Sequence, residues 1–212
     1  MKILFLVLLG FSIFIANDAF SGNASTFDIQ GFRLGDSFSE VKRKFPCQNP
    51  EIKKERINGK IKSIYVECNY KEDGLFLFVF GHDQKILSIN KVFRFKDFAP
   101  DYDHISKKIF LKYGKPKKTG KGLYYTNNQE LHSTCWGDCK TINFESNRYW
   151  EGSGVDHGDI GKSLVVDLKK NNGTFKAVLS IKLLDAGAVE DENKWYARME
   201  YQMRKKKSDI EF

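Results

Sequence analysis

The chain has 212 residues, of which 35 are basic and 27 acidic, so its formal net charge at pH 7 is +8. This length allows one large or two small domains with a real core, and the 14% of aromatic residues favours β-sheet over a helical bundle. A cationic surface attracts anionic lipids, glycans or acidic proteins at long range. We exclude nucleic acid as a partner, because the chain has the marks of an exported protein and carries no nucleic-acid recognition motif.

The first 24 residues have the pattern of a secretory signal peptide. Lys2 supplies a positive start, residues 3–16 form an apolar run, and a small-x-small cleavage motif occurs at 19–21 or 22–24. The apolar run is shorter than the roughly 20 residues that cross a bilayer, and no second apolar segment follows. We therefore expect a periplasmic or secreted protein with no transmembrane segment in its mature form.

Residues 25–99 are predicted to form a first module, a helix followed by antiparallel strands. An extended segment leads into a helix that Ser37 and Glu40 can close with a capping box and that Pro46 ends. After a charged segment, Asn58-Gly59 between strand formers indicates a hairpin turn. Strands are expected over residues 61–70, 74–81 and 86–95, the second of them buried on both faces.

Residues 100–187 repeat this order as a second module. Asp101 opens a helix whose apolar residues recur at four-residue spacing as far as Tyr113, and Gly114 ends it. Strands are expected over residues 123–126, 141–144, 164–169 and 175–184, with Asn172-Gly173 as a hairpin turn. Two explanations of the repetition stay open: a degenerate internal duplication, or two unrelated stretches that look alike.

Residues 188–212 are predicted to form a C-terminal helix with a basic tail. One face of this helix would carry Trp195, Tyr196, Met199 and Met203. The basic run over 204–207 complements the negative end of the helix dipole. The helix would either dock on the sheet by its aromatic face or bind a partner or a membrane surface.

The fold class expected from these elements is α+β, with two tandem helix-plus-antiparallel-sheet modules, disulfide staples and a C-terminal helix. The strand, glycine, capped helix and proline of residues 27–46, and a second copy ending in Lys112-Tyr113-Gly114-Lys115-Pro116, resemble the duplicated modules of the β-lactamase-inhibitor-protein-like group and of related small bacterial envelope proteins. The resemblance implies a protein-binding sheet face and no catalytic residues. No cysteine stands at the cleavage site, so a lipid anchor is not expected.

The four cysteines are predicted to form two disulfides, because export places them in an oxidising compartment. Cys47 with Cys68 would staple the first helix to the sheet, and Cys135 with Cys139 would close a small ring around Trp136. That ring is either a structural clamp or a recognition tip that presents the indole. Its Cys-x-x-x-Cys spacing differs from that of thiol oxidoreductases, which argues against redox catalysis.

An enzyme is the least favoured interpretation. His132, Cys135, Cys139 and His157 are residue types that bind zinc, and a metal-assisted activity would centre on the two histidines. The loose spacing of these residues and the oxidising compartment oppose a zinc site. We therefore expect no metal, no cofactor and no enzymatic activity.

The function expected from the sequence is non-enzymatic binding of another protein, by an inhibitor or an envelope accessory. An aromatic sheet face or loop tips would make the contact, with Trp136, Tyr149 and Trp150 as anchors. The alternative is a binder of an anionic envelope glycan or lipid, whose affinity would fall with salt. Its basic loop would contain Lys115, Lys117, Lys118 and Lys121.

Overall fold

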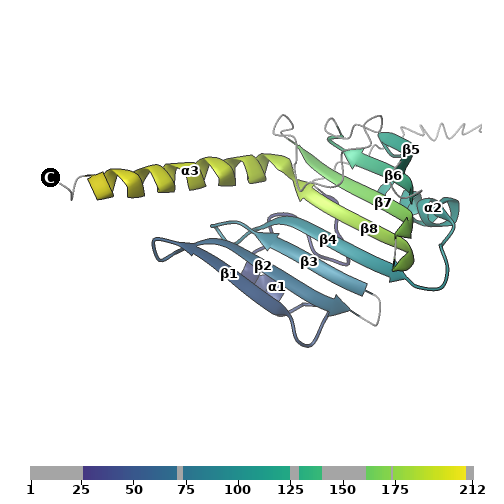
Figure 1. Cartoon of the computed structure of the whole chain (residues 1–212), viewed down its shortest axis with the longest axis horizontal. Helices are drawn as coiled ribbons and strands as arrows, with labels where there is room; N and C mark the ends of the chain where they lie inside the picture. Colours follow the sequence, from purple (N-terminus) through teal and green to yellow (C-terminus); the bar gives the residue numbers. More distant parts are fainter. Residues whose placement is uncertain (1–25, 71–73, 125–128, 140–160, 173, 209–212) are drawn as a thin grey trace, which may run out of the picture.

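A computed structural model describes residues 26–70, 74–124, 129–139, 161–172 and 174–208. The predicted signal peptide lies outside the described residues. The elements follow one another as a helix and four strands, a second helix and four strands, and a final helix (Figure 1). The helices are α1 (Phe38–Lys42), α2 (Tyr102–Tyr113) and α3 (Ala186–Ser208).

The strands form one eight-stranded sheet in the order β1-β2-β3-β4-β8-β7-β6-β5. They are β1 (Glu51–Ile57), β2 (Lys60–Tyr70), β3 (Gly74–Phe80), β4 (Ile86–Phe95), β5 (Lys118–Tyr124), β6 (Gln129–Gly137), β7 (Lys162–Asn172) and β8 (Phe175–Asp185). Every neighbouring pair is antiparallel, and residues 88–95 of β4 pair with residues 177–184 of β8, which joins the two halves of the chain. The expected α+β class is confirmed.

Local sequence signals explain where α1 begins and where α2 begins and ends. The Ser37 Oγ accepts from the Glu40 N–H at 3.3 Å while the Glu40 carboxylate accepts from the Ser37 N–H at 3.1 Å, so the predicted capping box is formed. Asp101 caps α2, and Gly114 ends it with a φ of 77°. The prediction that α1 continues to Pro46 is wrong, because the helix ends at Lys42.

The sequence patterns did not predict two of the strands. The strand β1 occupies the segment that was interpreted only as charged, and its exposed Lys53, Glu55 and Arg56 suit the edge of a sheet, where charge discourages pairing with another chain. The strand β6 contains the segment around Trp136 that was interpreted as a loop ring. The predicted turn at Asn58-Gly59 is present, with φ values of 54° and 76°. The strand expected over 141–144 lies outside the described residues.

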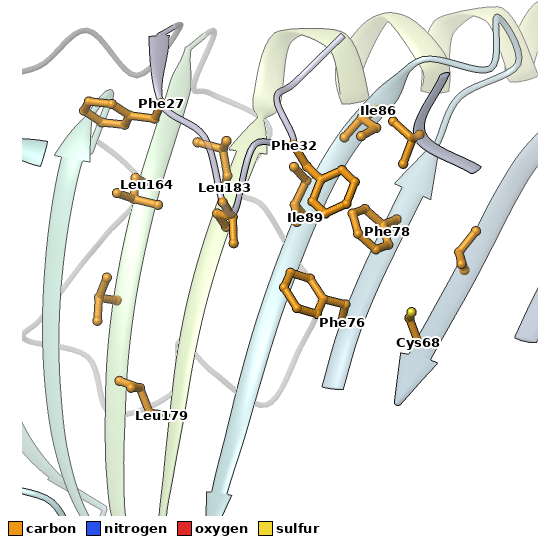
Figure 2. Close-up of a cluster of buried hydrophobic side chains, with 14 of the residues drawn as sticks. Phe27, Phe32, Cys68, Phe76, Phe78, Ile86, Ile89, Leu164, Leu179 and Leu183 are labelled. Carbon is orange, nitrogen blue, oxygen red and sulfur yellow. The ribbon is translucent and has the colours of Figure 1, made fainter. Parts of the chain in front are cut away.

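The aromatic core lies between one face of the sheet and the helices α1 and α2, together with the N-terminal segment that contains Phe27 and Phe32. Figure 2 shows Phe27 and Phe32 of this segment beside core side chains of the strands. Phe76, Phe78 and Phe80 of β3 all point to this covered face and are at most 1% exposed. The rings of Phe32 and Phe78 meet edge to face at 5.1 Å. The phenylalanine face of β3 therefore belongs to the core, and the predicted aromatic binding face stays a prediction for the opposite face of the sheet alone.

The opposite face, here called the outer face of the sheet, has a different composition. Tyr65 of β2 is 39% exposed there, and the neighbouring Leu77 and Val79 of β3 are half-buried. On the outer face of β3, Leu75 is buried at 6% exposed whereas Leu77 and Val79 are not, so the prediction of burial on both faces holds for the phenylalanine face and only in part for the outer face.

All four cysteines are bridged as predicted. The Cα atoms are 5.5 Å apart in the Cys47–Cys68 pair and 6.1 Å apart in the Cys135–Cys139 pair. The first bridge holds the segment after α1 against β2, and a loop of this length is worth about 3 kcal/mol in the chain-entropy description.

The helix α3 docks on the turn between β3 and β4. The Glu192 carboxylate accepts from the backbone N–H of His82 at 2.6 Å and lies 2.7 Å from the His82 ring Nδ1. The indole of Trp195 stacks on the His82 ring with centroids 4.2 Å apart. The C-terminal part of α3 projects away from the sheet (Figure 1). Among the described helices, none is long and apolar enough to cross a membrane.

Candidate ligand-binding site

The outward side of α2 and the loop that follows it carry a concentration of lysines. We define the basic surface as Lys107, Lys108, Leu111, Lys115 and Lys117. All five side chains are exposed, and Leu111 is 89% exposed, more than any other large apolar side chain of the described residues. Between His104 and Gln129 the sequence contains no acidic residue. The local charge of the surface is therefore strongly positive.

The helical period of α2 places these side chains on one side. Ile109 and Tyr113 are buried against the core, and a rotation of 100° per residue puts Lys107, Lys108 and Leu111 on the opposite side. In the described part of the chain, no carboxylate lies within 4.0 Å of the ammonium group of Lys107, Lys108, Lys115 or Lys117. The charges of the basic surface are consequently available to a ligand.

The strand β6 holds both ends of the basic loop. The Trp136 indole Nε1–H donates to the Gly114 carbonyl at 2.8 Å, and the Lys117 backbone N–H donates to the Cys135 carbonyl at 2.8 Å. Trp136 also packs edge to face on Phe110 of α2, with centroids 5.7 Å apart. Two lysines are thereby presented on a short segment that is fixed at each end.

The end of α2 is also tied to the N-terminal segment. The Tyr113 hydroxyl donates to the Asp28 carbonyl at 2.6 Å, and the Lys112 Nζ lies 3.2 Å from the Asp28 carboxylate. Burial opposes ionisation of this carboxyl, but the backbone N–H of Gly31 and the charge of Lys112 outweigh it and lower the pKa of Asp28. Lys112 thus has an acidic partner and is not counted in the basic surface.

A shallow pocket of about 450 Å³ opens beside the basic surface. It is lined by Phe110, Gly114, Lys115, Pro116, Lys117 and Thr119. The residues that line it include an aromatic residue, two lysines and a threonine. Such a lining suits a small anionic group attached to an apolar or sugar moiety.

The sequence-predicted binding residues have different locations in the structure. Lys115 and Lys117 lie in the basic surface, as the alternative interpretation requires. Lys118 and Lys121 belong to β5, but their side chains lie outside the described residues. Tyr149 and Trp150 also lie outside the described residues.

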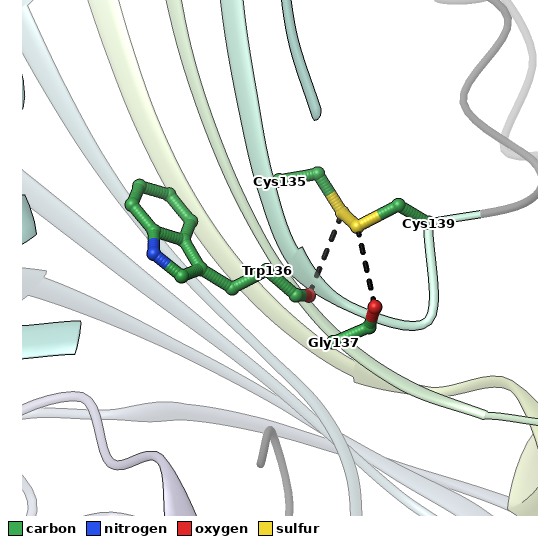
Figure 3. Close-up of a disulfide and its surroundings, with 4 residues drawn as sticks. All are labelled: Cys135, Trp136, Gly137 and Cys139. Carbon is green, nitrogen blue, oxygen red and sulfur yellow. Dashed lines mark hydrogen bonds between the residues drawn. A yellow bond between two sulfur atoms is a disulfide. The ribbon is translucent and has the colours of Figure 1, made fainter. Parts of the chain in front are cut away.

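Trp136 requires a correction. Its side chain is 1% exposed and packs beneath α2, so it is not a surface anchor at a loop tip. Figure 3 shows the indole on the opposite side of β6 from the Cys135–Cys139 bridge. The alternation of side chains along a strand is the cause, because neighbouring residues point to opposite faces.

The Cys135–Cys139 bridge closes the end of β6. The bridge sulfurs lie 3.5 Å from the carbonyl oxygens of Trp136 and Gly137, and Gly137 has a φ of 80°, which a glycine adopts without steric cost (Figure 3). Both cysteines are fully buried. These features describe a structural clamp rather than an exposed tip.

The zinc alternative loses its sulfur ligands, because the two thiols are joined to each other. The His132 Nε2 lies 2.7 Å from the Glu130 carboxylate, and the His132 ring packs near Tyr102. His157 lies outside the described residues. Within the described residues, no group of three metal-binding side chains comes together.

A buried polar cluster on β6, β7 and β8 was missed. The Ser133 hydroxyl donates to the carboxyl of Asp167, which is 4% exposed, and Lys182 lies on the neighbouring strand. Burial raises the pKa of Asp167 to about 7, against the hydrogen bond from Ser133 and the charges of Lys169 and Lys182. Burial likewise lowers the pKa of Lys182. The sequence signal for this cluster is the position of Asp167 between two apolar residues of a strand, Val166 and Leu168.

Comparisons of the chain with known protein families, with curated proteins and with solved structures found no match. The functional interpretation therefore depends on the residues and geometry of the site.

Proposed function

We propose that the protein is an exported, non-enzymatic binding protein that holds an anionic ligand, a glycan or a lipid head group, on its basic surface. The observation that carries this proposal is the set of exposed lysines on α2 and its following loop, with no described carboxylate in ion-pair distance. The segment Gly114–Lys117 is held at both ends by β6, so its backbone needs little further ordering when a ligand binds.

The test compares two lysine pairs that change the net charge equally. Lys115→Gln with Lys117→Gln removes charge from the basic surface, whereas Lys42→Gln with Lys44→Gln removes two exposed lysines in and after α1. A lysine near an anionic surface contributes about 1 kcal/mol, so the first pair should lower affinity about thirtyfold. The control pair should change it less than threefold.

The measurement uses dextran sulfate and, separately, vesicles of phosphatidylcholine with phosphatidylglycerol, each at low and high salt. We expect binding at low salt that weakens as salt screens the lysines. Absence of binding to both probes, or equal loss in the two lysine pairs, would contradict a localised anionic-ligand site.

A second candidate is the protein binding that the sequence analysis placed first. Tyr65 supports it, because this exposed aromatic side chain lies beside half-buried Leu77 and Val79 on the outer face of the sheet. Tyr65→Ala would abolish capture of a stoichiometric partner from an envelope extract, while leaving dextran sulfate binding unchanged. If the Tyr65→Ala variant still captures the partner, the outer face around Tyr65 is excluded as the protein-binding site.

We also infer that the two halves derive from duplication of one module, as in the β-lactamase-inhibitor-like group that the sequence resembles. The shared order of one helix followed by four antiparallel strands supports this origin. The four bridged cysteines support residence in an oxidising compartment.

A further inference from the structure

We infer that the anionic ligand is a lipid bilayer and that Leu111 inserts into it. This inference rests on the proposed function and adds the class of ligand and a contact residue. Leu111 lies in the middle of the basic surface and is 89% exposed. Transfer of a leucine side chain from water to a fully hydrated glycan is not favourable. Its transfer to the boundary between lipid head groups and acyl chains is favourable.

Lysines precede and follow this leucine, as binding at the interface between water and anionic lipid requires. Lys107 and Lys108 precede Leu111 by one helical turn, and Lys115 follows it by four positions. Lysine side chains can lay their methylene stems along the apolar boundary and keep their ammonium groups among lipid phosphates. The apolar and basic contributions would therefore act together on one side of α2.

The acidic residues of α2 determine which part of the helix approaches the bilayer. Asp101 caps the first turn and Asp103 lies within it, whereas the lysines occupy the last two turns and the loop. Contact by the C-terminal half of α2 keeps both carboxylates away from the anionic lipid. The pocket beside the basic surface shares Lys115 and Lys117 with it, so a phosphate head group held by these lysines can enter the pocket.

Among the described elements, the long helix α3 leaves this approach open. In Figure 1, α2 and the projecting part of α3 lie at opposite ends of the molecule. The buried side of α2 is fixed to the sheet by Ile109 and Tyr113, so insertion of Leu111 needs no rearrangement of the fold. One leucine and a few lysines give weak, reversible attachment of the whole protein.

The test separates insertion from charge attraction by substituting Leu111 alone. Leu111→Ser should lower partitioning onto vesicles of phosphatidylcholine and phosphatidylglycerol about tenfold and leave dextran sulfate binding unchanged. Tyr201→Ser is the matched control, because Tyr201 is 69% exposed on α3, away from the basic surface. It should leave vesicle binding unchanged.

Insertion itself is measured with brominated phosphatidylcholine in vesicles that also contain phosphatidylglycerol. Leu111→Trp should show quenching of the added indole beyond that of the parent protein, and Tyr201→Trp should not. Equal quenching in the two variants would overturn insertion. Circular dichroism of each variant verifies that the fold is retained.

The remaining outcomes distinguish this inference from the proposed function. Vesicle binding that needs Lys115 and Lys117 but ignores Leu111→Ser would overturn insertion and leave the anionic-ligand function standing. Binding of dextran sulfate without binding of vesicles would overturn the bilayer as ligand. Failure to bind either probe would overturn both proposals.

Discussion

At the scale of single residues, the same residue type has opposite roles according to its surroundings. Lys115 and Lys117 are exposed and unpaired among the described residues, which suits recognition of anions. Lys182 is half-buried near Asp167, and burial lowers its pKa. Lysine content alone therefore does not locate a binding surface.

Asp167 should make stability depend on pH. Its pKa rises from 3.8 to about 7 on folding, so between these values the native state binds more protons than the unfolded state. The resulting contribution to the free energy of unfolding is complete below pH 3.8 and is lost as pH rises through 7. Its size is on the order of 4 kcal/mol. Asp167→Asn should make the free energy of unfolding less dependent on pH, while the amide oxygen still accepts a hydrogen bond from Ser133.

Urea unfolding of both proteins between pH 4 and pH 8 measures this difference. The free energy of unfolding of the parent protein, relative to Asp167→Asn, should decrease as pH rises through this window. Parallel curves for the two proteins would show that the carboxyl of Asp167 does not change its proton affinity on folding.

At the scale of elements, α2 and α3 are attached to the sheet by different means. The helix α2 covers the aromatic core with Ile109 and Tyr113. The helix α3 instead contacts the sheet at a few points, chiefly at His82 and also where Tyr196 meets Lys62 of β2. An element with few tertiary contacts opens more easily than one that covers the core.

Glu192→Ala should therefore loosen α3 selectively. It removes the acceptor for both the backbone N–H and the ring of His82, and loss of such bonds costs about 1–3 kcal/mol. Hydrogen exchange of α3 amides should accelerate, while exchange in the core strands β3 and β7 stays slow. Asp191→Ala is the control, because this neighbouring carboxylate is exposed. Similar exchange rates in the two variants would refute the docking role of Glu192.

At the scale of the whole molecule, the two halves form one structural unit. The pairing of β4 with β8 makes the sheet continuous, and the aromatic core contains Phe76 and Phe78 from the first half together with Leu164 and Leu183 from the second. Separating the halves would break this pairing and expose the core. The repeated order of elements consequently does not make each half an independent domain.

We expect thermal unfolding in a single cooperative transition. Calorimetric and van't Hoff enthalpies should agree, and far-ultraviolet circular dichroism should give the same midpoint as calorimetry. Two resolved transitions, one for each half, would contradict a shared core.

Much of the fold is determined by local sequence. The capping box of Ser37 and Glu40, the turn at Asn58-Gly59 and the end of α2 at Gly114 depend on neighbouring residues, so the sequence alone predicts them. Both cysteine pairings were predicted as well, because each pair closes a short loop. The edge strand β1 and the strand β6 were not, since charged and polar side chains conceal the alternation that marks a strand.

The site depends on tertiary structure to a greater extent. The lysines after α2 are visible in the sequence, but only packing against β6 decides that Trp136 is buried and supports their loop. The exposure of Leu111 follows from the side of α2 that faces the core. From the sequence alone came the charge of the protein, both cysteine pairings and most of its helices and strands, because these depend on residues close together in the chain. Burial, which depends on contacts between distant residues, was decided only by the tertiary structure.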